Sequence, residues 1–145
     1  MTPLLDSLGR AIVLADRVVV AGNVGPSDVL VVTVTDGGEN ASHNVSARRL
    51  RQVIQSRERL GYEFLYLGAN QDSFSEAANM GVRYARNWNA TDRGTRVNMA
   101  RSGRLMSAKI AGKRLDSLSE ENFDLSDADE RQVDADTGKS APSPR

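Results

Sequence analysis

One short segment of the chain combines an acid with residues that let a ligand approach the main chain. Asp36 is followed by Gly37, Gly38 and Glu39. Glycine has no Cβ, so an ion or a partner can come close to its backbone, and carboxylate oxygens are hard ligands that suit Mg²⁺, Ca²⁺ or Mn²⁺. A tight turn accounts for the same residues equally well. The segment therefore predicts a cation or partner site, or a simple turn.

Asn70 and Asp72 form a second polar group. Both groups follow apolar runs typical of buried strands, Val29–Thr35 before Asp36 and Glu63–Leu67 before Asn70. In open parallel sheets, ligands bind beyond the carboxyl ends of the strands, where loops and helix N-termini gather. If the two strands are neighbours, the three polar residues share one edge. Taken alone, Asp72 is typical of an acid at the start of a helix.

Other signs of catalysis are scarce. The chain has no cysteine, which excludes disulfides, thiolate metal sites and a thiol nucleophile. His43, the one histidine, is interpreted as a solvated loop side chain. No catalytic triad, phosphate loop or HExxH motif has the required spacing. We predict that the chain is not an enzyme. A metal-dependent hydrolase using Asp36 and Asp72 stays as a further hypothesis, with divalent-dependent turnover abolished by Asp36→Asn as its signature.

Segments with a helical pattern alternate along the chain with segments that have a strand pattern. Helices are predicted over residues 3–16, 46–60, 73–80 and 94–111, and strands over 29–35, 63–67 and 82–88. Ser46 and Gly61 suit the two ends of the second helix, and Ser73 with Glu76 has the spacing of a capping box. This alternation predicts an α/β fold with a mainly parallel sheet covered by helices on both faces, the doubly wound or Rossmann-like architecture.

At the amino end, Thr2 and Pro3 have the types preferred at an N-cap and a first helical position. Isolated from other evidence, Thr2 is therefore interpreted as a cap rather than as a metal ligand. The chain carries neither a secretory signal nor an apolar run long enough to span a bilayer, so the expected location is the cytoplasm and no membrane partner is predicted.

Charge is unevenly distributed although the 19 basic and 19 acidic residues cancel. Basic side chains dominate residues 83–114, where Tyr84 and Trp88 add stacking faces, and this pattern allows an alternative function as a nucleic-acid accessory protein. Replacing Arg101 and Arg104 would then weaken binding. We favour a solvated basic face over nucleic-acid binding. Acids dominate residues 116–136, and residues 113–145 are predicted to form an acidic, largely disordered tail.

Three stretches resemble the von Willebrand factor A domain. They are VVTVTDGGENAS at 31–42, GYEFLYLGANQD at 61–72 and AANMGV at 77–82. More narrowly, they are similar to intracellular bacterial and phage forms that carry a TDGEENAS segment and a later GWEFLFLGANxD segment. The likeness covers residues 1–112, which we interpret as one domain of this type. It implies a protein-interaction module with a doubly wound sheet.

The resemblance also implies a metal-ion-dependent adhesion site, built from a DxSxS loop, a threonine and an aspartate. By position, Thr2 and Asp36 match the last two, whereas DxSxS has no counterpart. An intact domain of this type would bind Mg²⁺ or Mn²⁺ and capture a partner's carboxylate. Because Mg²⁺ takes about six oxygens and the DxSxS loop has no counterpart, this chain is expected to bind metal weakly or not at all. The expected partner-binding edge comprises Gly37, Gly38, Glu39, Asn70 and Asp72.

Lacking the DxSxS loop, the domain is interpreted as amino-terminally incomplete, without its first strands. The Val29–Val34 strand would then present an open apolar edge. The partner is accordingly expected to be a carboxylate-presenting protein or the missing amino-terminal half.

Overall fold

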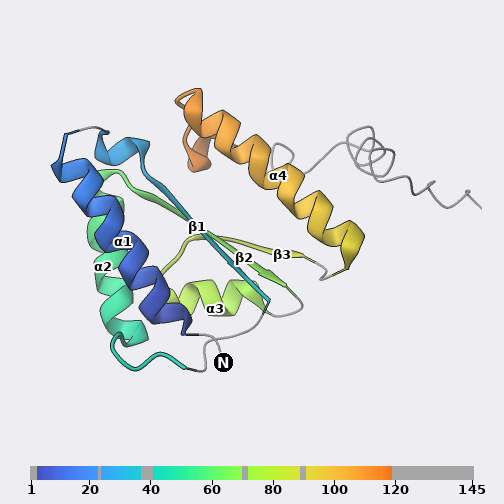
Figure 1. Cartoon of the computed structure of the whole chain (residues 1–145), viewed down its shortest axis with the longest axis horizontal. Helices are drawn as coiled ribbons and strands as arrows, with labels where there is room; N and C mark the ends of the chain where they lie inside the picture. The colour runs from blue at the N-terminus through green and yellow to red at the C-terminus, as the bar shows by residue number, and fades with distance from the viewer. Residues whose placement is uncertain (1–2, 23, 37–40, 70–71, 89–90, 119–145) are drawn as a thin grey trace, which may run out of the picture. The chain divides into compact units, whose positions relative to one another are not determined.

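The computed structural model of the chain describes residues 3–22, 24–36, 41–69, 72–88 and 91–118. The chain divides into two compact units, Met1–Trp88 and Asn89–Arg145 (Figure 1). None of the helices in these ranges is both long and apolar enough to cross a bilayer.

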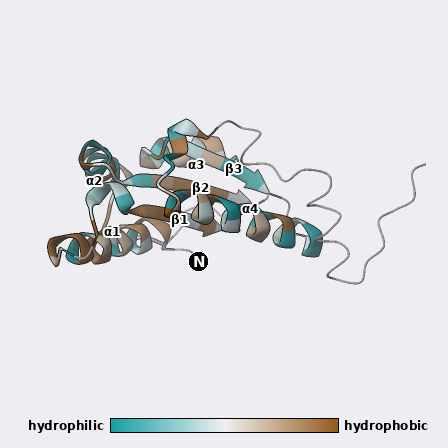
Figure 2. Cartoon of the chain, turned by 90° about the horizontal axis from the view of Figure 1, so that it is seen from above, coloured by the Kyte–Doolittle hydropathy of each residue, from teal (hydrophilic) through white to brown (hydrophobic). Residues whose placement is uncertain are grey.

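The first unit is built on a small parallel sheet. Strands β1 (Leu30–Thr35), β2 (Glu63–Ala69) and β3 (Tyr84–Trp88) pair in the order β1-β2-β3. Every residue of the central strand β2 is buried, and Figure 2 shows that hydrophobic residues predominate along β1 and β2. The predicted α/β class with parallel strands is therefore confirmed. A short 3₁₀ turn, Pro26–Asp28, leads into β1.

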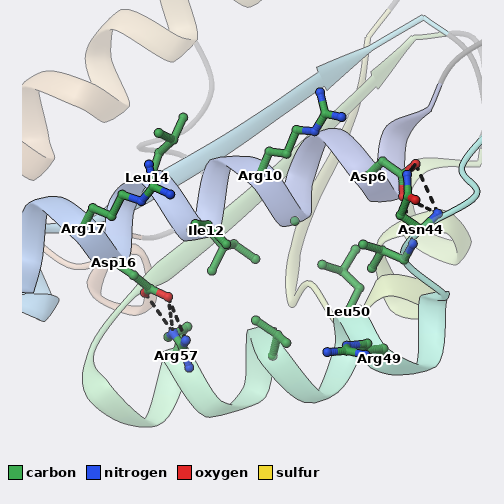
Figure 3. A pocket seen from close by; sticks show the side chains of 14 residues that line it. Asp6, Arg10, Ile12, Leu14, Asp16, Arg17, Asn44, Arg49, Leu50 and Arg57 are labelled. Carbon is green, nitrogen blue, oxygen red and sulfur yellow. Dashed lines mark hydrogen bonds and ion pairs between the residues drawn. The ribbon is translucent and has the colours of Figure 1, made fainter.

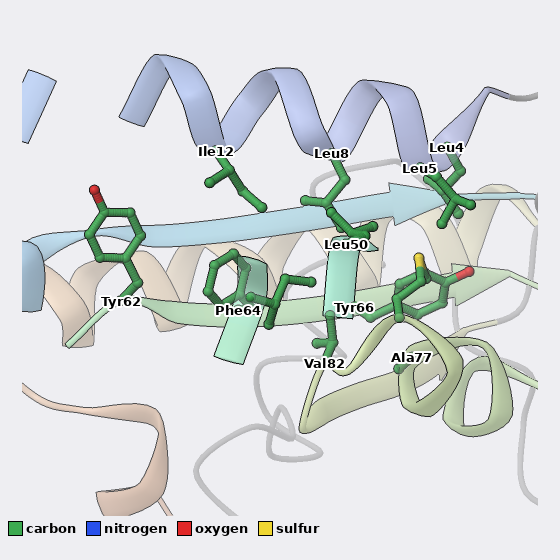
Figure 4. Close-up of a cluster of buried hydrophobic side chains, with 12 residues drawn as sticks. Leu4, Leu5, Leu8, Ile12, Leu50, Tyr62, Phe64, Tyr66, Ala77 and Val82 are labelled. Carbon is green, nitrogen blue, oxygen red and sulfur yellow. The ribbon is translucent and has the colours of Figure 1, made fainter. Parts of the chain in front are cut away.

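Three helices of this unit share one hydrophobic core with the sheet (Figure 4). They are α1 (Leu4–Val20), α2 (Ala47–Leu60) and α3 (Ser73–Met80). Within this cluster the most deeply buried side chains are Ile12, Leu50, Ile54, Phe64, Tyr66 and Ala77. Burying one such large aliphatic or aromatic group stabilises the fold by roughly 1.5–3 kcal/mol. The core therefore fixes α1, α2 and α3 against the same face of β2.

The ends of α2 follow the predicted signals. The Ser46 hydroxyl accepts a hydrogen bond from the Arg49 amide at 3.3 Å, and Gly61 closes the helix with a left-handed φ of 114°. A Cβ at position 61 would lie 3.1 Å from the Ser27 amide nitrogen. Gly61 is thus needed both for its backbone conformation and for the close approach of the turn before β1.

The predicted capping box at α3 was wrong. The N-cap is Asp72, whose carboxylate accepts from the Ser75 amide at 3.1 Å and from the Ser75 hydroxyl at 2.6 Å. Ser73 is fully buried as the first helical residue. Ser and Asp are both good caps. Because the Ser73 side chain is buried, Asp72 takes the cap position instead.

Helix α1 is longer than the predicted 3–16. It continues through Arg17 to Val20, and Gly22, with φ 77°, stands just beyond its end and donates to the Val19 carbonyl at 2.9 Å. Pro3 occupies the N-cap position without a side-chain bond, so its predicted place as the first helical residue was one position off.

The second unit contains α4 (Asp92–Ile110) and a 3₁₀ turn at Leu115–Ser117. Helix α4 begins two residues before the predicted start because the Thr91 hydroxyl accepts from the Gly94 amide at 3.0 Å and so caps it. The predicted disordered tail falls almost entirely on residues 119–145, which lie outside the described part of the chain.

Candidate functional site

The carboxyl ends of β1 and β2 lie at one edge of the sheet, because the two strands pair in parallel with Thr35 opposite Gly68. Asp36 directly follows β1, and its side chain is exposed. Asp72 comes after β2 at the start of α3 and is also exposed. The strands that precede the two predicted site aspartates are thus neighbours, as the sequence argument required.

The other predicted site residues lie outside the described ranges. They are Thr2, Gly37, Gly38, Glu39 and Asn70. Across the ranges that are described, no three His, Cys, Asp or Glu side chains come together as a group that could hold a metal ion. Asp72 is engaged by Ser75, and these hydrogen bonds lower its pKa. The described donors do not fit a magnesium site, and a site at Thr2 and Asp36 stays a prediction.

Two residues at this edge were not anticipated from the sequence. The Asn87 side-chain oxygen, at the end of β3, accepts from the Ser73 amide at 3.0 Å and so ties β3 to the start of α3. The Ser73 hydroxyl is buried and makes no hydrogen bond within the described structure. No local motif predicts this contact, because it depends on the strand order that brings β3 beside the start of α3.

Asp6 was also missed, although it organises the loop that precedes α2. Its carboxylate accepts from the backbone amides of His43, Asn44 and Val45 at 3.1, 3.1 and 2.8 Å. The Asp6 amide in turn donates to the Ser42 hydroxyl at 3.1 Å. These bonds lower the pKa of Asp6, the His43 amide contributing most. His43 engages this site through its backbone, and its side chain is exposed, which agrees with its interpretation as a solvated residue.

The outer edge of β1 is the most distinctive surface near Asp36. The Glu63 amide donates to the Val29 carbonyl at 3.0 Å, so the alternation of a parallel ladder directs the backbone of Val31 and Thr33 toward β2 and that of Val32 and Val34 outward. In the described chain β1 pairs with β2 alone. The outward amides and carbonyls at Val32 and Val34 therefore form an open edge.

The side chains at this edge are apolar and accessible. Val32 is 36% and Val34 50% exposed, and both lie on the sheet face opposite Val31, which packs against the core of α1 and α2. The strand contains no charged residue and no proline, the residues that commonly protect sheet edges from pairing. The edge is thus chemically suited to receive another strand.

The basic stretch 83–114 is not a uniformly unpaired surface. Arg83 lies 3.5 Å from the Glu58 carboxylate and Arg114 lies 3.9 Å from Asp116. Further basic residues also have interaction partners: Arg86, Arg93, Arg101, Arg104 and Lys109. Nucleic-acid binding by this stretch stays an untested alternative.

Comparisons of the chain with protein-family models, with curated proteins and with solved structures returned no match.

Proposed function

We propose that the chain is a protein-interaction module that binds a strand of a partner protein along the outer edge of β1. One observation carries this proposal: β1 is paired on one side, and its outward backbone groups lie beside the exposed side chains of Val32 and Val34. Strand addition uses such an edge directly, with main-chain hydrogen bonds giving affinity and side-chain contacts giving specificity.

The von Willebrand A-like resemblance and the doubly wound arrangement belong to this proposal. The parallel three-stranded sheet with helices between its strands supports both. The three helices described in the first unit share one face of β2, so helices on the second face are part of the proposal. The resemblance implies a partner that offers a carboxylate to a bound metal ion. Since the described donors do not fit that ion, backbone pairing at β1 is the interaction that the described residues support.

A module of this kind needs no catalytic group. Asp36 and Asp72 are both exposed, and Asp72 has a structural role as the cap of α3. A hydrolase would need one of them to position a water or a metal, and the carboxylate of Asp72 is already hydrogen-bonded to Ser75. The carboxyl edge at Asp36 is better suited to flank a bound strand.

The test compares partner binding by a variant that lacks the outward amide of Val32 with binding by a variant that keeps it. A partner captured by the full chain would be purified and titrated by calorimetry against Val32→Pro and Val32→Ala. Proline removes the outward amide, and loss of one hydrogen bond and its neighbouring contacts should weaken binding about tenfold or more, since tenfold is ~1.4 kcal/mol. Alanine keeps the amide and should retain affinity within about threefold.

Both variants must remain folded, so their far-ultraviolet circular dichroism spectra should match that of the parent chain. A partner that binds Val32→Pro as tightly as the parent would refute strand addition at this edge.

A further inference from the structure

A groove of about 830 Å³ runs between α1 and α2 (Figure 3). Its lining comes from the two helices and from the Asn44–Val45 loop before α2. All of these residues belong to the first compact unit.

At its two ends, aspartates of α1 form hydrogen bonds to the opposite side of the groove. Asp6 holds the loop of His43–Val45, and Asp16 accepts from the Arg57 guanidinium at 2.9 and 2.7 Å; Figure 3 shows each aspartate pointing toward its partner. Ten residues of helix separate them, or roughly 15 Å at about 1.5 Å per residue. The open part therefore spans about three helical turns, and its two carboxylates are already hydrogen-bonded.

The floor of the groove is aliphatic. Ile12 and Leu50 are almost completely buried beneath it, whereas Val13 remains 50% exposed. Gly9 lets the Val45 side chain pack closely against α1, because a Cβ there would stand 3.3 Å from a methyl carbon of Val45. A bound group with an apolar face would cover Val13 and its neighbours.

The rim is positively charged. Arg17 from α1 and Arg49 from α2 line the groove, and neither side chain has a hydrogen bond or an ion pair within the described structure. Arg10 extends this charge along the outer flank of α1 (Figure 3). Arg57 is neutralised by Asp16. The unpaired charges along the rim are thus arginines from both helices.

We infer that this groove is a docking site for an acidic amphipathic helix of a partner protein, with the apolar face of that helix on the Val13 floor and its carboxylates against Arg17 and Arg49. Charge complementarity selects this occupant: the floor requires apolar side chains and the rim requires carboxylates, which guanidinium groups bind in charge-assisted pairs. The floor has no aromatic residue on which a nucleic-acid base could stack. This surface is independent of the outer edge of β1.

The test uses the full chain and a fluorescent synthetic helix with leucines on one face and glutamates on the other, followed by anisotropy. Arg17→Glu and Arg49→Glu should each weaken binding about tenfold, because an attraction becomes a repulsion. Val13→Asp should weaken it at least as much. The matched control is Arg59→Glu, an exposed residue of α2 outside the groove, which should leave affinity within about twofold.

Several results would overturn the inference. They are absence of binding to the parent chain, equal weakening by Arg59→Glu, and equal binding of a probe whose leucines are replaced by serine. Tighter binding of an oligonucleotide or of anionic vesicles through the same arginines would also overturn it. If replacing Phe123 and Leu125 in the chain's own acidic segment tightened probe binding about tenfold, that segment rather than a partner would be the occupant.

Discussion

Thr33→Pro is expected to destabilise the chain severely, whereas Val32→Pro, one residue earlier, should leave it folded. The amide of Thr33 is directed toward the buried strand β2, where Thr33 is registered with Tyr66. Proline would remove that ladder bond and leave a buried acceptor without a partner, which together cost roughly 2–4 kcal/mol. The amide of Val32 points outward, and proline is tolerated at such edge positions. The cost of Val32→Pro should stay within about 1 kcal/mol.

Urea denaturation followed by the fluorescence of Trp88 would measure both free energies of unfolding. Val32→Ala and Thr33→Ala are the controls, because they shorten the side chains and keep both amides. Equal destabilisation by the two prolines would mean that Val32 is also bonded within the folded chain, and the edge assignment would fail.

The second large effect concerns the ion pair that joins α1 to α2. Asp16 accepts from Arg57 and from the Tyr62 hydroxyl at 2.8 Å, and the Asp16 and Arg57 side chains are 26% and 29% exposed. The Arg57 hydrogen bond, followed by that of Tyr62, lowers the pKa of Asp16. Asp16→Ala should therefore cost about 2–3 kcal/mol at neutral pH, because it breaks charge-assisted bonds and leaves Arg57 without its partner.

The pH dependence has a defined sign. Because the folded-state pKa of Asp16 is lowered, its contribution is complete above the unfolded value of about 3.9 and is lost as pH falls through the folded value. The difference in unfolding free energy between the parent and Asp16→Ala should shrink below about pH 4.

Glu58 offers a control of opposite sign. Desolvation raises its pKa, against a smaller opposing effect of Arg83, so any stability gained from its proton is present at low pH and is lost as pH rises through the folded value. Glu58→Gln should be near neutral or slightly stabilising at pH 7. A constant cost of Asp16→Ala between pH 3 and 7 would contradict the ion-pair account, and a marked destabilisation by Glu58→Gln would contradict the sign assigned to Glu58.

Local signals in the sequence predicted much of the architecture. The ends of α2 were predicted correctly because Ser46 and Gly61 act on backbone groups within a few residues. The cap of α3 was misplaced by one residue, since Asp72 and Ser73 are equally good caps and burial decided between them. The end of α1 was predicted at residue 16, but the helix continues through Val18 and Val19 to Val20, just before Gly22.

The candidate surfaces were less visible in the sequence. An open edge beside Val32 was expected from the resemblance, but which amides point outward depends on the register of β1 and β2. The α1–α2 groove was not anticipated, because its ends depend on pairings such as Asp16 with Arg57, which lie 41 residues apart. Long-range contacts of this kind are set by packing and leave no local motif.

Residue-resolved amide hydrogen exchange of the full chain at low concentration tests the central proposal most directly. Slow exchange at Val31 and Thr33 with fast exchange at Val32 and Val34 is the result expected of a strand whose outer backbone groups are unpaired in the isolated chain. Uniformly slow exchange at all four amides would show that this side is already paired in the isolated chain, and would contradict its proposed use in binding a partner strand.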